Sequence, residues 1–231
     1  MAATLTQRTA TRTVVVRHLP AQCAAVHGGL PRGARLAYWR TLIDAATDAE
    51  APEVQALAGV LATAFERHGT QLQPLTGLGA GATRHLLARW FPGVDAALEI
   101  DWHALANATR DEPRADEIED LVALLADNGA AAAGDREETL WVAHALGQAS
   151  LGEDHLWQDL HLPSRRELSA LMTRWFPALA ARNDRDMKWK KFLYKQLCDK
   201  AQLQICRAPS CGVCSDYAVC YGPEEAQAVA A

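Results

Sequence analysis

The stretch Val54-Gln-Ala-Leu-Ala-Gly-Val-Leu-Ala-Thr-Ala-Phe65 decides the fold class. Its large apolar residues recur three or four positions apart, which is the spacing of one face of an α-helix. They are Val54, Leu57, Leu61 and Phe65. Alanine, the strongest helix former, fills half of the remaining positions. The stretch therefore predicts an amphipathic helix.

The same periodicity continues on both sides of this stretch. The repeating apolar positions are Leu36, Trp39, Leu42 and Ile43 in an earlier segment and Ile118, Leu121, Val122 and Leu125 in a later one. Asp116 and Glu117 would occupy the first turn of the later helix, where acidic side chains interact favourably with the helix dipole. No alternating strand pattern of useful length appears, so the chain is predicted to be all-α.

A second feature is an internal echo. Arg89-Trp-Phe-Pro92 recurs as Arg174-Trp-Phe-Pro177, and the same offset aligns further apolar positions. Proline ends a helix because it lacks the amide donor and clashes with the preceding turn. We interpret the echo as a duplicated helical scaffold, with repeats at about 39–92 and 118–177; the alternative is chance similarity in a chain rich in alanine and leucine.

Composition limits the remaining possibilities. The formal net charge of −5 does not suggest a general affinity for nucleic acid, and no apolar stretch approaches the roughly 18 residues of a membrane span. No acidic residue precedes Asp44, so the arginine-containing beginning resembles an organelle transit peptide. We interpret it instead as a flexible tail over 1–34, followed by a helical domain over 35–200. We expect a cytoplasmic protein without nucleic-acid or membrane partners.

The third part, 201–231, is predicted to be a cysteine-rich metal-cluster loop with a C-terminal tail. It contains four of the six cysteines in the run Cys206-Arg-Ala-Pro-Ser-Cys211-Gly-Val-Cys214-Ser-Asp-Tyr-Ala-Val-Cys220. Cysteines that only pack are scattered through a core, whereas four in one short loop can converge on a single inorganic centre. Cys206, Cys211, Cys214 and Cys220 are therefore the predicted ligands.

Three interpretations of this C-x4-C-x2-C-x5-C motif are disulfide bonds, a zinc site and an iron–sulfur cluster. Disulfides need an oxidising compartment, and the N-terminus shows no secretory signal. Structural zinc sites usually pair two C-x2-C units across a longer spacer, and only one such unit is present here. The opening C-x4-C-x2-C spacing occurs in iron–sulfur ligation, although there the fourth cysteine lies far downstream. The motif favours an iron–sulfur cluster and leaves zinc as the alternative.

The segment before the cysteines predicts an amphipathic, locally basic helix, for which Asn183 or Asp184 is a candidate N-cap. Its apolar face comprises Trp189, Phe192, Leu193 and Leu197, and its basic residues are Lys188, Lys190, Lys191 and Lys195. The lysines are accessory candidates that would attract an oxyanion or an acidic partner, or offset the charge of a thiolate-bound cluster. The alternative is an ordinary solvated helix face.

Other polar residues have a weaker claim to a role. Cys198, at the end of the basic helix, is either an accessory thiolate or a packed helix residue. His155 and His161 flank a Trp-Gln-Asp-Leu segment, where a surface or capping role is the simpler interpretation. No arrangement of a nucleophile with a base and no P-loop is present, so covalent catalysis and nucleotide hydrolysis are not supported.

The C-terminal half closely resembles the NifQ family, the nitrogen-fixation proteins that handle molybdenum during assembly of the iron–molybdenum cofactor. The segments that carry the resemblance are Leu156-Trp-Gln-Asp-Leu-His-Leu-Pro-Ser-Arg-Arg-Glu-Leu168, Phe176-Pro-Ala-Leu-Ala-Ala-Arg-Asn183, Asp186-Met-Lys-Trp-Lys-Lys-Phe192, the cysteine motif and Tyr221-Gly-Pro-Glu224. The resemblance is strongest from about Leu156 to Glu224.

The resemblance implies a molybdenum–iron–sulfur cluster held by Cys206, Cys211, Cys214 and Cys220. It also implies a stoichiometric donor, not an enzyme, that passes molybdenum to the nitrogenase iron protein and the cofactor scaffold complex.

Two alternative functions stay open. One is a DNA-repair protein of the helix-hairpin-helix type with a structural iron–sulfur cluster, suggested by the glycines of Leu75–Thr83 and by Asp101. The other is an interaction module whose C-terminus is held by zinc.

Overall fold

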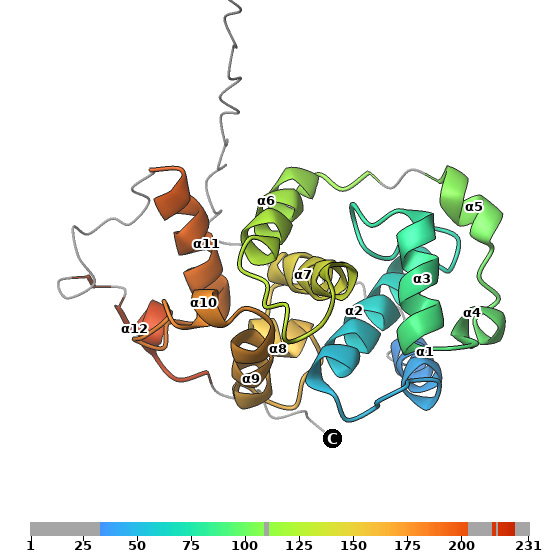
Figure 1. The fold of residues 1–231 in the computed structure, drawn as a ribbon, viewed down its shortest axis with the longest axis horizontal. Coiled ribbons are helices and arrows are strands. Elements are labelled where there is room, and N and C mark those ends of the chain that lie inside the picture. Colours follow the sequence, from blue (N-terminus) through green and yellow to red (C-terminus); the bar gives the residue numbers. More distant parts are fainter. Residues whose placement is uncertain (1–32, 109–110, 203–213, 216, 225–231) are drawn as a thin grey trace, which may run out of the picture.

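The computed structural model describes residues 33–108, 111–202, 214–215 and 217–224, and these residues form twelve helices and no strand (Figure 1). The all-α prediction is confirmed. The predicted tail over 1–34 lies almost wholly outside the described residues. The helices are α1 (Gly33–Asp44), α2 (Pro52–His68), α3 (Ala80–Trp90), α4 (Val94–Ala97), α5 (Trp102–Asn107), α6 (Ala115–Ala126), α7 (Arg136–Ser150), α8 (Leu156–Asp159), α9 (Arg165–Trp175), α10 (Pro177–Ala180), α11 (Trp189–Lys200) and α12 (Tyr217–Tyr221).

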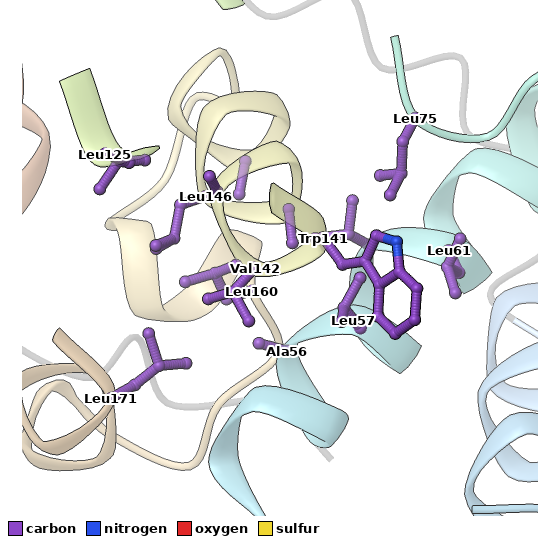
Figure 2. Close-up of a cluster of buried hydrophobic side chains, with 14 of the residues drawn as sticks. Ala56, Leu57, Leu61, Leu75, Leu125, Trp141, Val142, Leu146, Leu160 and Leu171 are labelled. Carbon is purple, nitrogen blue, oxygen red and sulfur yellow. The ribbon is translucent and has the colours of Figure 1, made fainter. Parts of the chain in front are cut away.

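Helices α2 and α7 form the centre of the molecule. α1 packs on α2, α6 packs on α7, and α2 contacts both α7 and α9. Figure 2 shows their apolar side chains converging on one cluster, with Leu57 and Leu61 from α2 and Trp141 and Leu146 from α7. Each of these four side chains is at most 1% exposed. The segment from Val54 to Phe65 therefore lies in α2, the central helix of the core.

The two Trp-Phe-Pro segments end their helices in the same way. α3 ends at Trp90 and α9 at Trp175, as predicted, and the phenylalanine that follows each is fully buried. Phe91 and Phe176 share one backbone conformation, with φ, ψ of −135°, 59° and −133°, 55°. The buried aromatic ring after each helix closes that end of the core.

Ion pairs cross between the two halves in a reciprocal manner. Arg89, at the end of α3, lies 3.0 Å from Glu138 of α7. Arg174, at the corresponding point of α9, lies 2.8 Å from Glu53 of α2. Each half thus supplies the arginine for one pair and the acid for the other, as a pseudo-two-fold arrangement requires. An evolutionary duplication stays a prediction.

Helix α11 lies at one end of the molecule beside α12, opposite α4 and α5 (Figure 1). It packs against α6 and buries Trp189, Phe192 and Leu193, so its predicted apolar face is confirmed. The predicted cap is wrong: the helix begins at Trp189, and Asn183 instead bonds both to the Met187 N–H (2.8 Å) and to the Met187 carbonyl (2.9 Å). Asn183 closes the loop before the helix.

Within the part of the chain that the structure describes, no helix has the length and apolar character needed to cross a lipid bilayer.

Candidate metal centre

Two of the four predicted cluster ligands lie in the described part of the chain, and both are partly exposed. Cys214 accepts a hydrogen bond at its carbonyl from the N–H of Tyr217 (3.3 Å), in the turn that begins α12. Cys220 is on α12, and it packs at the edge of the core. Cys206 and Cys211 lie outside the described residues.

The described residues contain no group of three or more side chains from cysteine, histidine, aspartate or glutamate placed to hold a metal ion. The two described thiols fit a soft metal centre by their chemistry, since thiolate sulfur is the ligand that iron–sulfur clusters use. Their partial exposure would also leave a centre here accessible to a partner.

The backbone of Cys220 is held at the beginning of α11. The Cys220 carbonyl accepts a hydrogen bond of 2.8 Å from the N–H of Lys188, the residue that precedes the helix. The amino end of a helix carries a partial positive charge because its first N–H groups have no partner within the helix. The carbonyl of the last cysteine of the motif therefore satisfies an N–H group at the amino end of α11.

Beside this point is a surface cavity of about 340 Å³. It is bounded by the segment around α8, by the first turn of α11 and by α12. Its lining includes His155, Gln158, Lys188, Lys190, Lys191 and Val219. Three acidic residues also contribute to the lining: Glu153 and Asp154, which are exposed, and Glu224.

The predicted lysines divide into two groups. Lys190 forms an ion pair with Asp159 and donates to the Gly152 carbonyl (2.9 Å), and Lys195 forms an ion pair with Asp199. Burial raises the pKa of Asp159, and the hydrogen bond from Lys190 opposes that rise. Across the described ranges, Lys188 and Lys191 have no ion-pair partner. These two are the accessory lysines that line the cavity without an ion pair to any described residue, and they share its wall with three carboxylates.

Two further accessory candidates have packing or capping positions. Cys198 is 6% exposed on α11, which favours the packed interpretation. The ring of His155 accepts the N–H at the third position of α8, and the Gln158 side chain accepts the His155 N–H (3.1 Å). His155 therefore caps α8, and it also contributes to the cavity wall.

His161 is partly buried against α2, where its Nε2 lies 3.0 Å from the Thr63 hydroxyl. A Cβ atom added at Gly59 would come within 2.7 Å of the His161 side chain, so this close approach of the two segments needs a glycine. Burial, with a smaller contribution from Arg35, lowers the pKa of His161 to about 4. His161 is thus a neutral, partly buried residue at the contact with α2, and it belongs to no metal-binding group of described side chains.

This pKa makes stability depend on pH. The unfolded chain takes up a proton on histidine near pH 6.5, whereas the folded chain resists protonation of His161 until about pH 4. The free energy of unfolding should therefore fall as pH decreases through this window. We expect His161→Asn, which tolerates the positive φ of 58° at this position, to flatten the fall between pH 7 and pH 5 in urea titrations. His103→Asn, at an exposed position, is the control. Equal pH dependence in His161→Asn and the parent protein would contradict this assignment.

The residues that suggested a DNA-repair protein have structural roles. Asp101 caps α5, where its carboxylate accepts the N–H groups of His103 (3.0 Å) and Ala104 (2.9 Å). Gly77 has φ of 79°, a conformation that glycine adopts without strain, in the loop that leads to α3.

No role was predicted for Arg165 or Glu224 from the sequence, where they only form part of the segments that resemble the NifQ family. In the structure, their side chains contact each other. The Arg165 guanidinium forms an ion pair with Glu224, whose side chain is 4% exposed. It also contacts the Asp186 carboxylate (2.7 Å) and the carbonyls of Asp186 (3.1 Å) and Met187 (3.0 Å). One signal in the sequence was available: a cation at the first position of a helix is unfavourable for the dipole and so needs other partners.

Comparison with known proteins identifies relatives of this chain. The NifQ family profile matches residues 56–222. Protein NifQ of Azotobacter vinelandii is 39% identical over 166 residues, which cover 69% of this chain and 84% of that protein. Protein NifQ of Rhodobacter capsulatus is 36% identical over 175 residues, covering 74% and 90%. Protein NifQ of Klebsiella pneumoniae is 46% identical over 81 residues, covering 35% and 48%. No solved structure matches the chain. The match to the family profile and the two long alignments show that the chain belongs to the NifQ family.

Proposed function

We propose that this protein is a stoichiometric carrier of a molybdenum–iron–sulfur cluster that donates molybdenum for assembly of the iron–molybdenum cofactor of nitrogenase. Membership of the NifQ family supports a role in nitrogen fixation. The observation that carries the finer proposal is the position of Cys220, which lies at the amino end of α11 beside a cavity lined by two lysines that form no ion pair with a described residue.

The proposed ligands are Cys206, Cys211, Cys214 and Cys220. A thiolate-bound iron–sulfur fragment would supply soft bridging sulfides onto which molybdenum can be accepted. The chain's own contribution is to hold the thiolates at the surface, where bound metal remains available for transfer. The proposed recipients are the nitrogenase iron protein and the cofactor scaffold complex, and transfer to them does not require catalytic turnover.

The cavity beside Cys220 is the proposed entry point for molybdate. Molybdate is a tetrahedral oxyanion, and Lys188 and Lys191 offer it positive charge that is not taken up by an ion pair with any described residue. Cationic side chains in a cavity wall raise the local concentration of an anionic substrate. The exposed Glu153 and Asp154 keep the attraction moderate, which suits an anion that must be handed on.

This entry point is tested by the double variant Lys188→Gln/Lys191→Gln. When cells grow on limiting molybdate, we expect its molybdenum content to fall by about tenfold while its iron content is kept, because only electrostatic capture is lost. Ample molybdate should restore the molybdenum content. Lys195→Gln, whose lysine already pairs with Asp199, is the matched control. Unchanged molybdenum content at limiting molybdate would exclude these lysines from capture.

A further inference from the structure

We infer that Arg165 and Glu224 form a positioning pair, which fixes the C-terminal side of the cysteine motif, including Cys220, against the amino end of α11. The inference rests on the proposed function only in treating Cys220 as a cluster ligand. Arg165 and Glu224 do not touch the metal in this account; they act through Cys220.

The surroundings of Arg165 are unusual for the beginning of a helix. Arg165 is the first residue of α9, where the helix dipole disfavours a positive charge. Its guanidinium is instead satisfied by acceptors from two other segments: Glu224, and the loop at Asp186 and Met187. The side chain thus joins α9, the loop before α11 and the chain after α12.

Glu224 depends on this contact. Its side chain is 4% exposed, and a carboxylate removed from water is costly unless it is paired and hydrogen-bonded. His155 lies 3.9 Å away and offers only a longer contact. Arg165 is therefore the partner that makes burial of the carboxylate tolerable.

The pair acts together with the backbone bond of Cys220. The loop that Arg165 contacts, through the Met187 carbonyl, continues directly into Lys188, whose N–H binds the Cys220 carbonyl. Cys220 therefore bonds directly to the segment 186–188, and Glu224 is joined to the same segment through Arg165. α12, with five residues, is too short to be a stable helix by itself. These two contacts therefore add to the core packing of Cys220 in holding it in place.

The test measures the reactivity of Cys220 in the full-length, metal-free, reduced protein. Iodoacetamide is added, and the alkylation of each cysteine is followed by peptide mass spectrometry. We expect Glu224→Gln and Arg165→Gln each to accelerate alkylation of Cys220 by about tenfold, because loss of a charge-assisted hydrogen bond lets the segment detach more often. Cys198, buried in α11, serves as an internal reference whose rate should not change.

Arg166→Gln is the matched control, since Arg166 is the next residue, its side chain is 90% exposed, and its ion pair is with the adjacent Glu167. Glu224→Gln keeps the shape of the side chain and leaves the contacts of Arg165 with the loop intact, so it tests the pair even if Arg165→Gln fails to fold. In protein purified with its metal, Glu224→Gln should also alter the electron paramagnetic resonance line shape at an unchanged melting temperature.

Unchanged Cys220 alkylation in Glu224→Gln would overturn the inference, as would equal acceleration in Arg166→Gln. The alkylation result stands apart from the proposed function, because it is obtained without metal. A chain that purified with zinc alone would overturn the cluster proposal and leave the positioning pair to be decided by the alkylation rates.

Discussion

Cys220→Ala is expected to abolish the bound molybdenum and to remove most of the iron from protein purified without oxygen. A cluster that loses one of four thiolates lacks a ligand at one metal. The side chains that line the cavity beside Cys220 offer nitrogen or oxygen donors, from lysines, His155, Glu153, Asp154 and Glu224, and these do not replace a soft sulfur donor. Metal analysis of the purified variant measures the effect.

The control for this variant is Cys198→Ala, which removes a thiol of the same chain eight residues before the motif. Because Cys198 is buried in α11, its loss should cost some stability and leave the metal content near that of the parent. Full molybdenum loading of Cys220→Ala would contradict ligation by this residue. Loss of metal from Cys198→Ala with an intact fold would instead restore Cys198 as an accessory ligand.

Trp141→Ala is expected to lower the free energy of unfolding by about 3–5 kcal/mol, as large-to-small changes of buried aromatic residues do. Trp141 lies on α7 within the apolar cluster of Figure 2 and is fully buried. Its ring stands edge-on to that of Trp90, with 5.5 Å between the ring centroids. Its indole nitrogen has no hydrogen-bond partner among the described residues, so the expected loss is one of packing. Urea unfolding followed by circular dichroism measures it.

Trp102→Ala provides the matched comparison. Trp102 is only partly buried on α5, where the Arg84 guanidinium lies 4.6 Å from its ring centroid. We expect Trp102→Ala to lower the free energy of unfolding by about 1 kcal/mol. The substitution removes less buried apolar surface than Trp141→Ala does, and an exposed cation–π contact is weak. Equal losses at the two positions would mean that α7 is not the centre of the core.

The sequence predicted the helices because their apolar periodicity is a local property. The positions that marked α1, α2 and α6 are helical, and the Trp-Phe-Pro segments end α3 and α9 as expected. The start of α11 was mispredicted because Asn183 binds the backbone of Met187, four residues on, in a loop and not in the first turn of the helix. Capping rules alone do not separate these two uses of one side chain.

For the candidate site, the sequence predicts a set of ligands, which stays a prediction, but not the contacts around them. The cysteine spacing names four thiols, whereas the pairing of Lys190 with Asp159 and of Arg165 with Glu224 joins segments far apart in the chain. Such contacts depend on how α8, α9 and α11 pack, which no local pattern encodes. The lysines looked equivalent in the sequence. A tertiary ion pair with Asp159 sets Lys190 apart, and a local pair with Asp199, one helical turn on, sets Lys195 apart from Lys188 and Lys191.

The most direct test of the account is metal analysis, combined with electron paramagnetic resonance, of the parent protein purified without oxygen from cells supplied with molybdate. The account predicts iron and molybdenum together, with a paramagnetic signal from an iron–sulfur centre. Iron without molybdenum, or zinc alone, would contradict a molybdenum-donating cluster at Cys206, Cys211, Cys214 and Cys220.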